Sequence, residues 1–159
     1  MEIRRSALIG HPAASTFDLI EAAEHYPEFL PWCASATILA RDDSVVAARL
    51  TVDYRGLRFD LTTRNPKQRP HWMAVRLEAG PFRRFEGEWR LVDLGADACK
   101  IEFALRYEFD SALVGKLADS VFGRIADTMI GAFAARADDV LGRPRGGADP
   151  TDADPGNQS

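Results

Sequence analysis

The sequence predicts an α+β fold in which a curved, seven-stranded antiparallel sheet wraps around one long C-terminal helix. Residues 36–109 alternate apolar and polar side chains, which is the period of strands that bury one face and expose the other. The segments between these strands are too short for crossover helices, so consecutive strands pair as a meander. Residues 113–141 then space their apolar side chains by three and four, as a helix does.

Length and composition agree with one globular domain. The chain has 159 residues, of which 46% are hydrophobic and 28% charged, enough to bury a substantial core. No apolar run reaches the roughly 18 residues of a membrane span, and the N-terminus lacks a signal-peptide pattern, so we expect a soluble, cytoplasmic protein. We expect residues 1–141 to form the domain. Residues 142–159 contain no large apolar side chain and are expected to be a disordered acidic tail.

Charge and cysteine content exclude several kinds of partner and site. The chain has 20 lysines and arginines, of which two fall in the tail, and 24 aspartates and glutamates, of which three do. The domain therefore has 18 basic and 21 acidic residues. This near-neutral charge argues against a general attraction to nucleic acid, and we expect no DNA partner. Cys33 and Cys99 are too few for a disulfide framework or a zinc site, so we interpret both as small packing residues.

Three short elements precede the meander. Residues 2–10 suggest a first strand, and residues 13–23 change to helical spacing. Residues 25–33 contain Pro27 and Pro31, which prevent a long helix. We therefore predict a short helical turn followed by an aromatic-rich loop.

Six strands follow, each ending at turn-forming residues. These residues place the connections at 41–44, 55–56, 65–70, 80–81 and 95–97. The alternate side chains predicted to face the interior are Val46, Ala48, Leu50, Val52, Tyr54, Leu57, Phe59, Leu61, Thr63, Met73, Val75, Leu77, Phe85, Gly87, Trp89, Leu91, Ile101, Phe103, Leu105, Tyr107 and Phe109.

The last element is a helix of about 45 Å, long enough to cross the whole sheet. Asp110 or Ser111 can cap its first turn. This order of elements is a helix-grip arrangement: one strand, a helical pair, six meandering strands and the long helix. The space between helix and sheet is lined by apolar side chains and holds either a ligand cavity or a tightly packed core. The apolar stripe of the helix comprises Val114, Leu117, Val121, Ile125, Met129, Phe133, Ala137 and Val140.

Five segments in order resemble a known family. The first segment is the aromatic loop at 26–33, Tyr-Pro-Glu-Phe-Leu-Pro-Trp-Cys. The third is the segment at 80–89, Gly-Pro-Phe-Arg-Arg-Phe-Glu-Gly-Glu-Trp. The second, fourth and fifth segments are 62–65, 99–103 and 129–137. Together, over about residues 3–141, they resemble the START-like family of the polyketide cyclase (SRPBCC) superfamily. That family contains the mitochondrial coenzyme Q-binding protein and the bacterial ribosome-association toxin RatA.

The resemblance implies a START- or Bet v-like helix-grip fold with a hydrophobic tunnel, and it implies several functions. The first is non-enzymatic binding of ubiquinone or a related isoprenoid lipid in support of respiration, with no required cofactor and with transient contact with the inner membrane. The second is a RatA-type toxin that binds the large ribosomal subunit and inhibits subunit association, which the near-neutral charge weakens. The third is a polyketide cyclase-like enzyme, which a lack of interior acid–base groups disfavours.

No catalytic or metal site is predicted. His11, His25 and His71 fall in separate loop-like contexts without the spacing of metal ligands. Nucleophile elbows, phosphate loops and dinucleotide fingerprints are absent from the sequence. Buried tyrosines are more often hydrogen-bonded core residues than acids or bases. The polar side chains expected inside the sheet are Tyr54, Thr63 and Tyr107.

The aromatic loop and a pair of arginines are open to two interpretations each. At the end of a cavity the loop can stack on a quinone or touch a membrane, or it can plug the open end of the sheet. We favour the ligand role for Tyr26 and Trp32 and the plug for Phe29 and Leu30.

Alternation predicts that Arg83 and Arg84 point to opposite faces of their strand, so that only one is exposed. We interpret them as strand charges partnered by Glu86 and Glu88, and the alternative is a contact with phospholipid or ribosomal RNA phosphate.

The residues predicted to line or border the ligand tunnel come from the loop, the inner sheet face and the helix. They are Tyr26, Phe29, Trp32, Leu50, Val52, Tyr54, Phe59, Leu61, Met73, Val75, Phe82, Trp89, Phe103, Tyr107, Val121, Phe122, Ile125, Met129 and Phe133.

Overall fold

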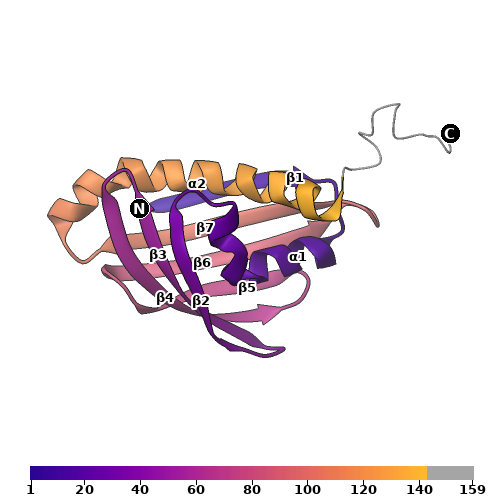
Figure 1. Cartoon of the computed structure of the whole chain (residues 1–159), viewed down its shortest axis with the longest axis horizontal. Coiled ribbons are helices and arrows are strands. Elements are labelled where there is room, and N and C mark those ends of the chain that lie inside the picture. Colours follow the sequence, from indigo (N-terminus) through magenta and orange to yellow (C-terminus); the bar gives the residue numbers. More distant parts are fainter. Residues whose placement is uncertain (143–159) are drawn as a thin grey trace.

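The computed structural model describes residues 1–142 and confirms the predicted α+β architecture (Figure 1). Apart from Gly142, the tail predicted at 142–159 lies outside the described residues. In chain order the elements are β1 (Glu2–Ile9), α1 (Ala13–Glu21), the 3-10 helix η1 (Ala23–Glu28), β2 (Cys33–Arg41), β3 (Val45–Tyr54), β4 (Leu57–Gln68), β5 (Trp72–Ala79), β6 (Phe82–Asp93), β7 (Cys99–Phe109) and α2 (Ala112–Leu141).

The seven strands form one antiparallel sheet with the order β1-β7-β6-β5-β4-β3-β2. Strands β2 to β7 therefore form the predicted meander, and β1 closes the sheet beside β7. Figure 1 shows α2 running along the sheet, with α1 and η1 beside the C-terminal half of that helix. The core lies between these helices and the inner face of the sheet.

Strand β7 shows how the sequence pattern produces this core. Its odd-numbered residues from Cys99 to Phe109 are buried, and the residues between them are more exposed. Because successive side chains of a strand point to opposite faces, this pattern places one apolar row beneath α2. Ile101 and Tyr107 in that row are almost fully buried, with 0% and 1% of their surface exposed.

Strand β4 is longer than the sequence predicts. The turn expected at 65–70 begins only at Arg69, because Lys67 and Gln68 still pair with Met73 and Trp72 of β5. Pro66 pairs with Val45 at the start of β3. Residues that favour turns are thus kept in a strand by the two neighbouring strands, which is an effect of tertiary structure on local preference.

The prediction that only one of Arg83 and Arg84 is exposed is wrong, because both are. The register of β6 on β7 shifts between Phe82 and Arg84, and this extra residue is a β-bulge. The bulge allows Phe82 and Phe85 both to be buried although they are three positions apart. The arginines pair with surface carboxylates, Arg83 with Glu108 at 3.4 Å and Arg84 with Glu86 at 2.8 Å.

Helix α2 begins where the sequence predicts, since Ser111 Oγ accepts a hydrogen bond from the backbone N–H of Val114. The predicted buried stripe is confirmed at Ile125, Met129, Phe133 and Ala137. It is wrong at Val114, Leu117 and Val140, which are 42%, 72% and 51% exposed, because the two ends of α2 are not covered by other elements. Among the described helices, none is long and apolar enough to cross a membrane. The buried residues of α2 are Ala118, Phe122, Ile125, Ala126, Met129, Ile130, Phe133 and Ala137.

Candidate functional site

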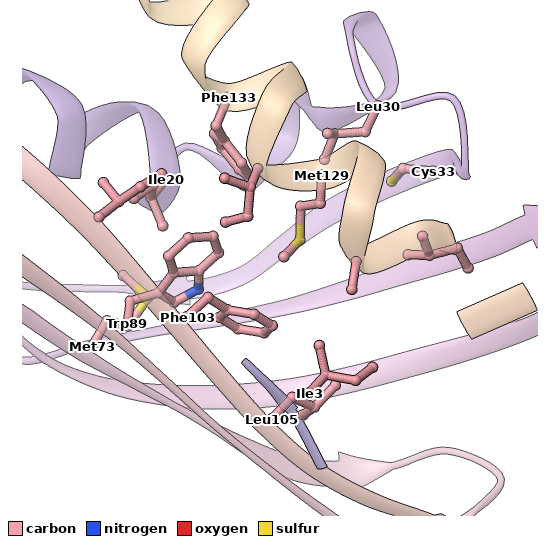
Figure 2. Close-up of a cluster of buried hydrophobic side chains, with 14 of the residues drawn as sticks. Ile3, Ile20, Leu30, Cys33, Met73, Trp89, Phe103, Leu105, Met129 and Phe133 are labelled. Carbon is pink, nitrogen blue, oxygen red and sulfur yellow. The ribbon is translucent and has the colours of Figure 1, made fainter. Parts of the chain in front are cut away.

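A cavity of about 120 Å³ lies between α2 and the inner face of the sheet. Figure 2 shows part of its wall, with Met129 and Phe133 pointing from α2 towards Trp89 and Phe103 on the sheet. Trp89 packs at 4.5 Å, between ring centroids, on Phe103 and at 5.5 Å on Phe133. Aromatic rings thus border the cavity both from the sheet and from α2, and the thioether of Met129 borders it from α2.

The structure places most of the predicted site residues in this wall. Their contact with a ligand stays a prediction. Those that line the cavity are Tyr26, Trp32, Leu50, Val52, Leu61, Met73, Val75, Trp89, Phe103, Phe122, Ile125, Met129 and Phe133. Those placed outside the lining are Phe29, Tyr54, Phe59, Phe82, Tyr107 and Val121. Lining residues that the prediction left out are Ile3, Ile20, Glu21, Ala23, Val46, Ala48, Thr63, Asn65, Phe85, Leu105 and Ala126.

Several predicted residues miss the cavity because they fill the space beside it. Phe82 packs on Phe59, Phe109 and Phe122, with ring centroids 5.4, 4.5 and 6.0 Å apart. Tyr107 adds a contact of 4.6 Å with Phe122. We call these five residues the aromatic cluster. It packs the end of the interior nearest the start of α2, and Phe122 belongs both to it and to the cavity wall.

The aromatic loop turns its rings inwards rather than towards solvent. The Tyr26 ring contacts Phe29 and Phe133, with centroids 6.0 and 5.5 Å apart, and its hydroxyl donates to the backbone carbonyl of Ile20. Removal of this hydroxyl from water raises the pKa of Tyr26. Trp32 is 6% exposed and Leu30 only 1%. Tyr26 and Phe29 are half-buried and pack on Phe133 of α2, and contact of this loop with a membrane stays a prediction.

The polar part of the wall differs from the prediction. Of the three polar residues expected inside, Thr63 lines the cavity, whereas Tyr54 and Tyr107 do not. The Tyr107 hydroxyl instead donates to Asp119 at 3.2 Å. Glu21 and Asn65 line the cavity instead, and the sequence predicts neither as an interior residue, although Asn65 ends the segment 62–65 that contributes to the resemblance. Glu21 ends an amphipathic helix and Asn65 falls in a segment that the sequence predicts as a turn, so no local pattern marks them as internal.

Glu21 is held by two cations at the edge of the cavity. Its carboxylate accepts hydrogen bonds from Lys67 Nζ at 2.7 Å and Arg41 Nε at 3.0 Å. The side chains of Glu21 and Lys67 are only 15% and 9% exposed. These contacts join the end of α1 to β2 and β4, and they compensate the charge of a carboxylate that borders an apolar space.

Two buried polar atoms of the lining residues have no hydrogen-bond partner within residues 1–142, namely Trp32 Nε1 and Asn65 Oδ1. The Asn65 amide nitrogen makes only a long contact of 3.8 Å with Met73 Sδ. By contrast, the indole of Trp72, outside the cavity, donates to Glu88 at 2.7 Å. Buried polar atoms are nearly always paired, so unpaired ones in a cavity wall mark points where a ligand can be recognised.

The cysteines and histidines do not assemble into a reactive centre. Cys33 and Cys99 are free and buried, and burial raises the pKa of Cys33 to about 11. Each histidine contacts one carboxylate. The pairs are His11–Asp138 at 2.8 Å, His25–Glu28 at 2.7 Å and His71–Asp93 at 2.8 Å. In the described part of the chain no three metal-ligating side chains cluster.

The chain is similar to proteins of known family and fold. Residues 9–134 match the family described as polyketide cyclase/dehydrase and lipid transport. A protein of Pseudomonas aeruginosa, "Ribosome association toxin RatA", is 39% identical over 140 residues, which cover 88% of this chain and 97% of that protein. The mitochondrial "Coenzyme Q-binding protein COQ10 homolog B" of Xenopus laevis is 25% identical, over 90% of this chain and 60% of its own length.

Among solved structures, the Zhui aromatase/cyclase from Streptomyces sp. R1128 superimposes with a TM-score of 0.79. The alignment covers 93% of this chain and 99% of that one, at 20% identity. At this identity the likeness shows a shared fold and carries no inference about activity.

Proposed function

This chain belongs to the polyketide cyclase/dehydrase and lipid transport family, and on that basis we propose that it binds an isoprenoid quinone such as ubiquinone, or a related isoprenoid lipid, in its cavity. The binding is non-enzymatic. The observation that carries this proposal is the mostly apolar wall between α2 and the sheet, to which seven aromatic side chains contribute. A quinone ring is flat and apolar on both faces, and it stacks on such walls.

The tail of the ligand supplies most of the affinity. Each buried methylene contributes about 0.8 kcal/mol when it leaves water. The cavity of about 120 Å³ is smaller than the roughly 300–1,000 Å³ of typical ligand pockets, so binding requires the wall to move. Met73 and Met129 are suited to this movement because their unbranched side chains adopt many rotamers at little cost.

The head of the ligand is oriented by Trp32. A quinone carbonyl or methoxy oxygen accepts a hydrogen bond from Nε1, which the described residues leave unpaired. The acid–base groups of the wall are already engaged, Glu21 with Lys67 and Arg41, and Tyr26 with a backbone carbonyl. A group held in this way is poorly placed to move a proton during a reaction, which favours binding over catalysis.

The test is binding of ubiquinone by the full-length protein. Organic extracts of the purified protein are compared by mass spectrometry with those of an unrelated protein of similar size, and added short-tail ubiquinone is titrated. We expect quinone enrichment and saturable binding. Absence of both, with no other isoprenoid lipid enriched in the extracts, would refute the proposal.

A Trp32→Phe variant tests the orientation of the head. Loss of one hydrogen bond of about 1–2 kcal/mol should weaken ubiquinone binding roughly 5- to 30-fold. An isoprenoid hydrocarbon of equal length, which has no oxygen, should bind wild type and variant alike. Equal weakening for both ligands would mean that Trp32 acts only through packing.

A second candidate function is inhibition of ribosomal subunit association through contact with the large subunit. The observation that favours it is the 39% identity, over nearly the whole of both chains, to the RatA protein of Pseudomonas aeruginosa. Sedimentation of purified subunits with and without the protein tests it. A decrease in joined ribosomes supports this function, and an unchanged profile at excess protein rules it out.

A further inference from the structure

One end of the cavity is polar, and its polar groups come from β4 and from the end of α1. Thr63 and Asn65 of β4 line the cavity, and Lys67 pairs with Met73, another lining residue. Lys67 Nζ contacts Glu21, the last residue of α1, at 2.7 Å. Asn65 and Glu21 therefore border the same end of the cavity, since alternate residues of a strand share one face. We call these two residues the acceptor pair.

Asn65 contributes an oxygen that lacks a hydrogen-bond donor. Its Oδ1 is buried and has no partner within residues 1–142. The amide nitrogen lies 3.8 Å from Met73 Sδ. A thioether sulfur accepts hydrogen bonds and cannot donate them, so the nitrogen belongs on the side of Met73 and the oxygen on the other side. A buried acceptor without a donor costs free energy, which a hydrogen-bond donor on a ligand would offset.

Glu21 contributes a second such oxygen. Lys67 Nζ and Arg41 Nε both contact Oε2 of this carboxylate, at 2.7 and 3.0 Å. Within the described chain no group donates to the other oxygen, Oε1. The two cations compensate the charge of Glu21, so Oε1 can accept a further hydrogen bond while the carboxylate stays ionised. Hydrogen bonds to an ionised acceptor are stronger than those between neutral groups.

The acceptor pair distinguishes ligands by whether they carry a hydrogen-bond donor. Lys67 and Arg41 do not line the cavity, and the Thr63 hydroxyl can both donate and accept, so it favours neither kind of ligand. A quinone oxygen only accepts, so it can pair with Trp32 Nε1 but not with the acceptor pair. A hydroquinone hydroxyl also donates, and a hydroquinone can therefore satisfy unpaired atoms of both kinds.

We propose that the acceptor pair makes the cavity selective for the reduced, hydroquinone form of an isoprenoid quinone, with Asn65 Oδ1 accepting a hydrogen bond from a ring hydroxyl. This selectivity rests on the proposed function, because it concerns the same cavity and the same class of ligand. The ligand is already reduced when it binds, and the protein carries out no redox step. Tighter binding of the reduced form makes the bound ligand harder to oxidise than the free one.

Competition between the two redox forms tests the proposal. Short-tail ubiquinone and its borohydride-reduced hydroquinone are titrated separately into the full-length protein by anaerobic equilibrium dialysis. We expect the hydroquinone to bind at least about fivefold more tightly, the effect of one net hydrogen bond. By linkage, a fivefold preference raises the midpoint potential of the bound two-electron couple by about 20 mV.

A third ligand separates the hydrogen-bond donor from the shape of the ring. The dimethyl ether of the hydroquinone keeps the reduced ring and has no hydroxyl, so wild type should bind it no more tightly than the quinone. If the ether binds as tightly as the hydroquinone, the preference comes from shape and the proposal is wrong. This arm uses the wild-type protein and does not depend on the folding of a variant.

The variant Asn65→Leu removes the acceptor and keeps a side chain of similar size. It should bind both redox forms about equally, with no loss of quinone affinity and an equal or higher melting temperature. The matched control is Thr62→Val, on the outer face of the same strand, which should keep the wild-type preference. Trp32→Phe should weaken both redox forms by the same factor, because each carries an acceptor oxygen.

The outcomes separate this proposal from the proposed function. Saturable binding of the quinone with no preference for the hydroquinone overturns the selectivity and leaves the proposed function standing. A preference that persists in Asn65→Leu overturns the assignment of the acceptor to Asn65. If neither redox form binds to wild type, the proposed function fails, and the selectivity fails with it.

Discussion

The chemistry of the cavity depends on a few polar atoms that burial has isolated. Most of the wall repels water, so each polar atom within it has a large effect on which ligand fits. Lys67 and Arg41 compensate the charge of Glu21, and the Tyr26 hydroxyl donates a hydrogen bond to the Ile20 carbonyl. Trp32 Nε1 and Asn65 Oδ1 remain unpaired within residues 1–142, and the proposed function assigns to Trp32 Nε1 the selection of a ligand with an acceptor oxygen.

Burial also determines the reactivity of the cysteines. A pKa of about 11 for Cys33, against an ordinary value of 9.0, lowers its thiolate fraction at pH 8 by about 100-fold. We therefore predict that iodoacetamide alkylates Cys33 in the folded protein at least 100-fold more slowly than in urea. Peptide mass spectrometry over a time course measures the rate, and Cys33→Ala reports Cys99 alone. Rapid alkylation of folded Cys33 would show that the start of β2 opens readily.

At the scale of the element, the strands and helices could be predicted because each buries one face. The period-two pattern of β7 and the period of α2 from Ile125 to Ala137 follow from that requirement. Errors occur where neighbours decide the outcome. The bulge at Arg83 depends on how β6 pairs with β7. The exposure of Leu117 depends on where the sheet ends. Local periodicity encodes neither of these features.

Helix α2 should tolerate a charge on its outer face and not on its inner face. Phe133 is 2% exposed and packs on Tyr26, Phe29 and Trp89, so Phe133→Asp buries a carboxylate among rings. We expect destabilisation by about 3–5 kcal/mol or failure to fold. Arg124 is exposed on the same helix, and Arg124→Asp should change stability by only about 0.5 kcal/mol.

Urea denaturation followed by circular dichroism measures both variants. Arg136 is a poorer control than Arg124, because it pairs with Glu28 at 2.8 Å and covers the Phe29 ring. Similar unfolding midpoints for Phe133→Asp and Arg124→Asp would mean that α2 is not packed on the sheet in solution.

At the scale of the whole molecule, a twisted sheet around a single helix leaves space that side chains must fill or a ligand must occupy. The sequence predicts this arrangement, and most of the aromatic and aliphatic wall follows from the alternation of the strands. It could not predict the boundary between cavity and aromatic cluster. Phe59 belongs to the same inward row as Leu61, and the bulge in β6 brings Phe82 to the face of Trp89. Only packing in three dimensions decides which of these side chains meet.

The domain should be stable without the residues beyond Gly142. The described core consists of residues from Ile3 to Ala137, and the Gly142 N–H still donates to the Asp138 carbonyl at the end of α2. We predict that a chain ending at Gly142 melts within a few degrees of the full chain and binds ubiquinone equally well. Differential scanning calorimetry and ligand titration measure these properties. A large fall in melting temperature would mean that residues 143–159 contribute to the fold.

Filling the cavity should separate the two candidate functions. Ala126 is 4% exposed and lines the cavity from α2, so Ala126→Leu introduces three further carbons into it. Filling a void without strain raises stability or leaves it unchanged. We predict an equal or higher melting temperature together with loss of saturable ubiquinone binding. Ala135→Leu, exposed on the same helix, is the matched control and should bind ubiquinone normally.

An effect on ribosomal subunits that operates through the outer surface should be the same in Ala126→Leu as in wild type, because that surface does not change. We therefore expect sedimentation profiles of subunits to respond equally to both proteins. If Ala126→Leu loses ubiquinone binding and also its effect on the subunits, the cavity must be occupied for the ribosomal contact to form. If it keeps ubiquinone binding, the cavity between α2 and the sheet is not where the ligand lies, since three added carbons in so small a space leave no room for a quinone ring.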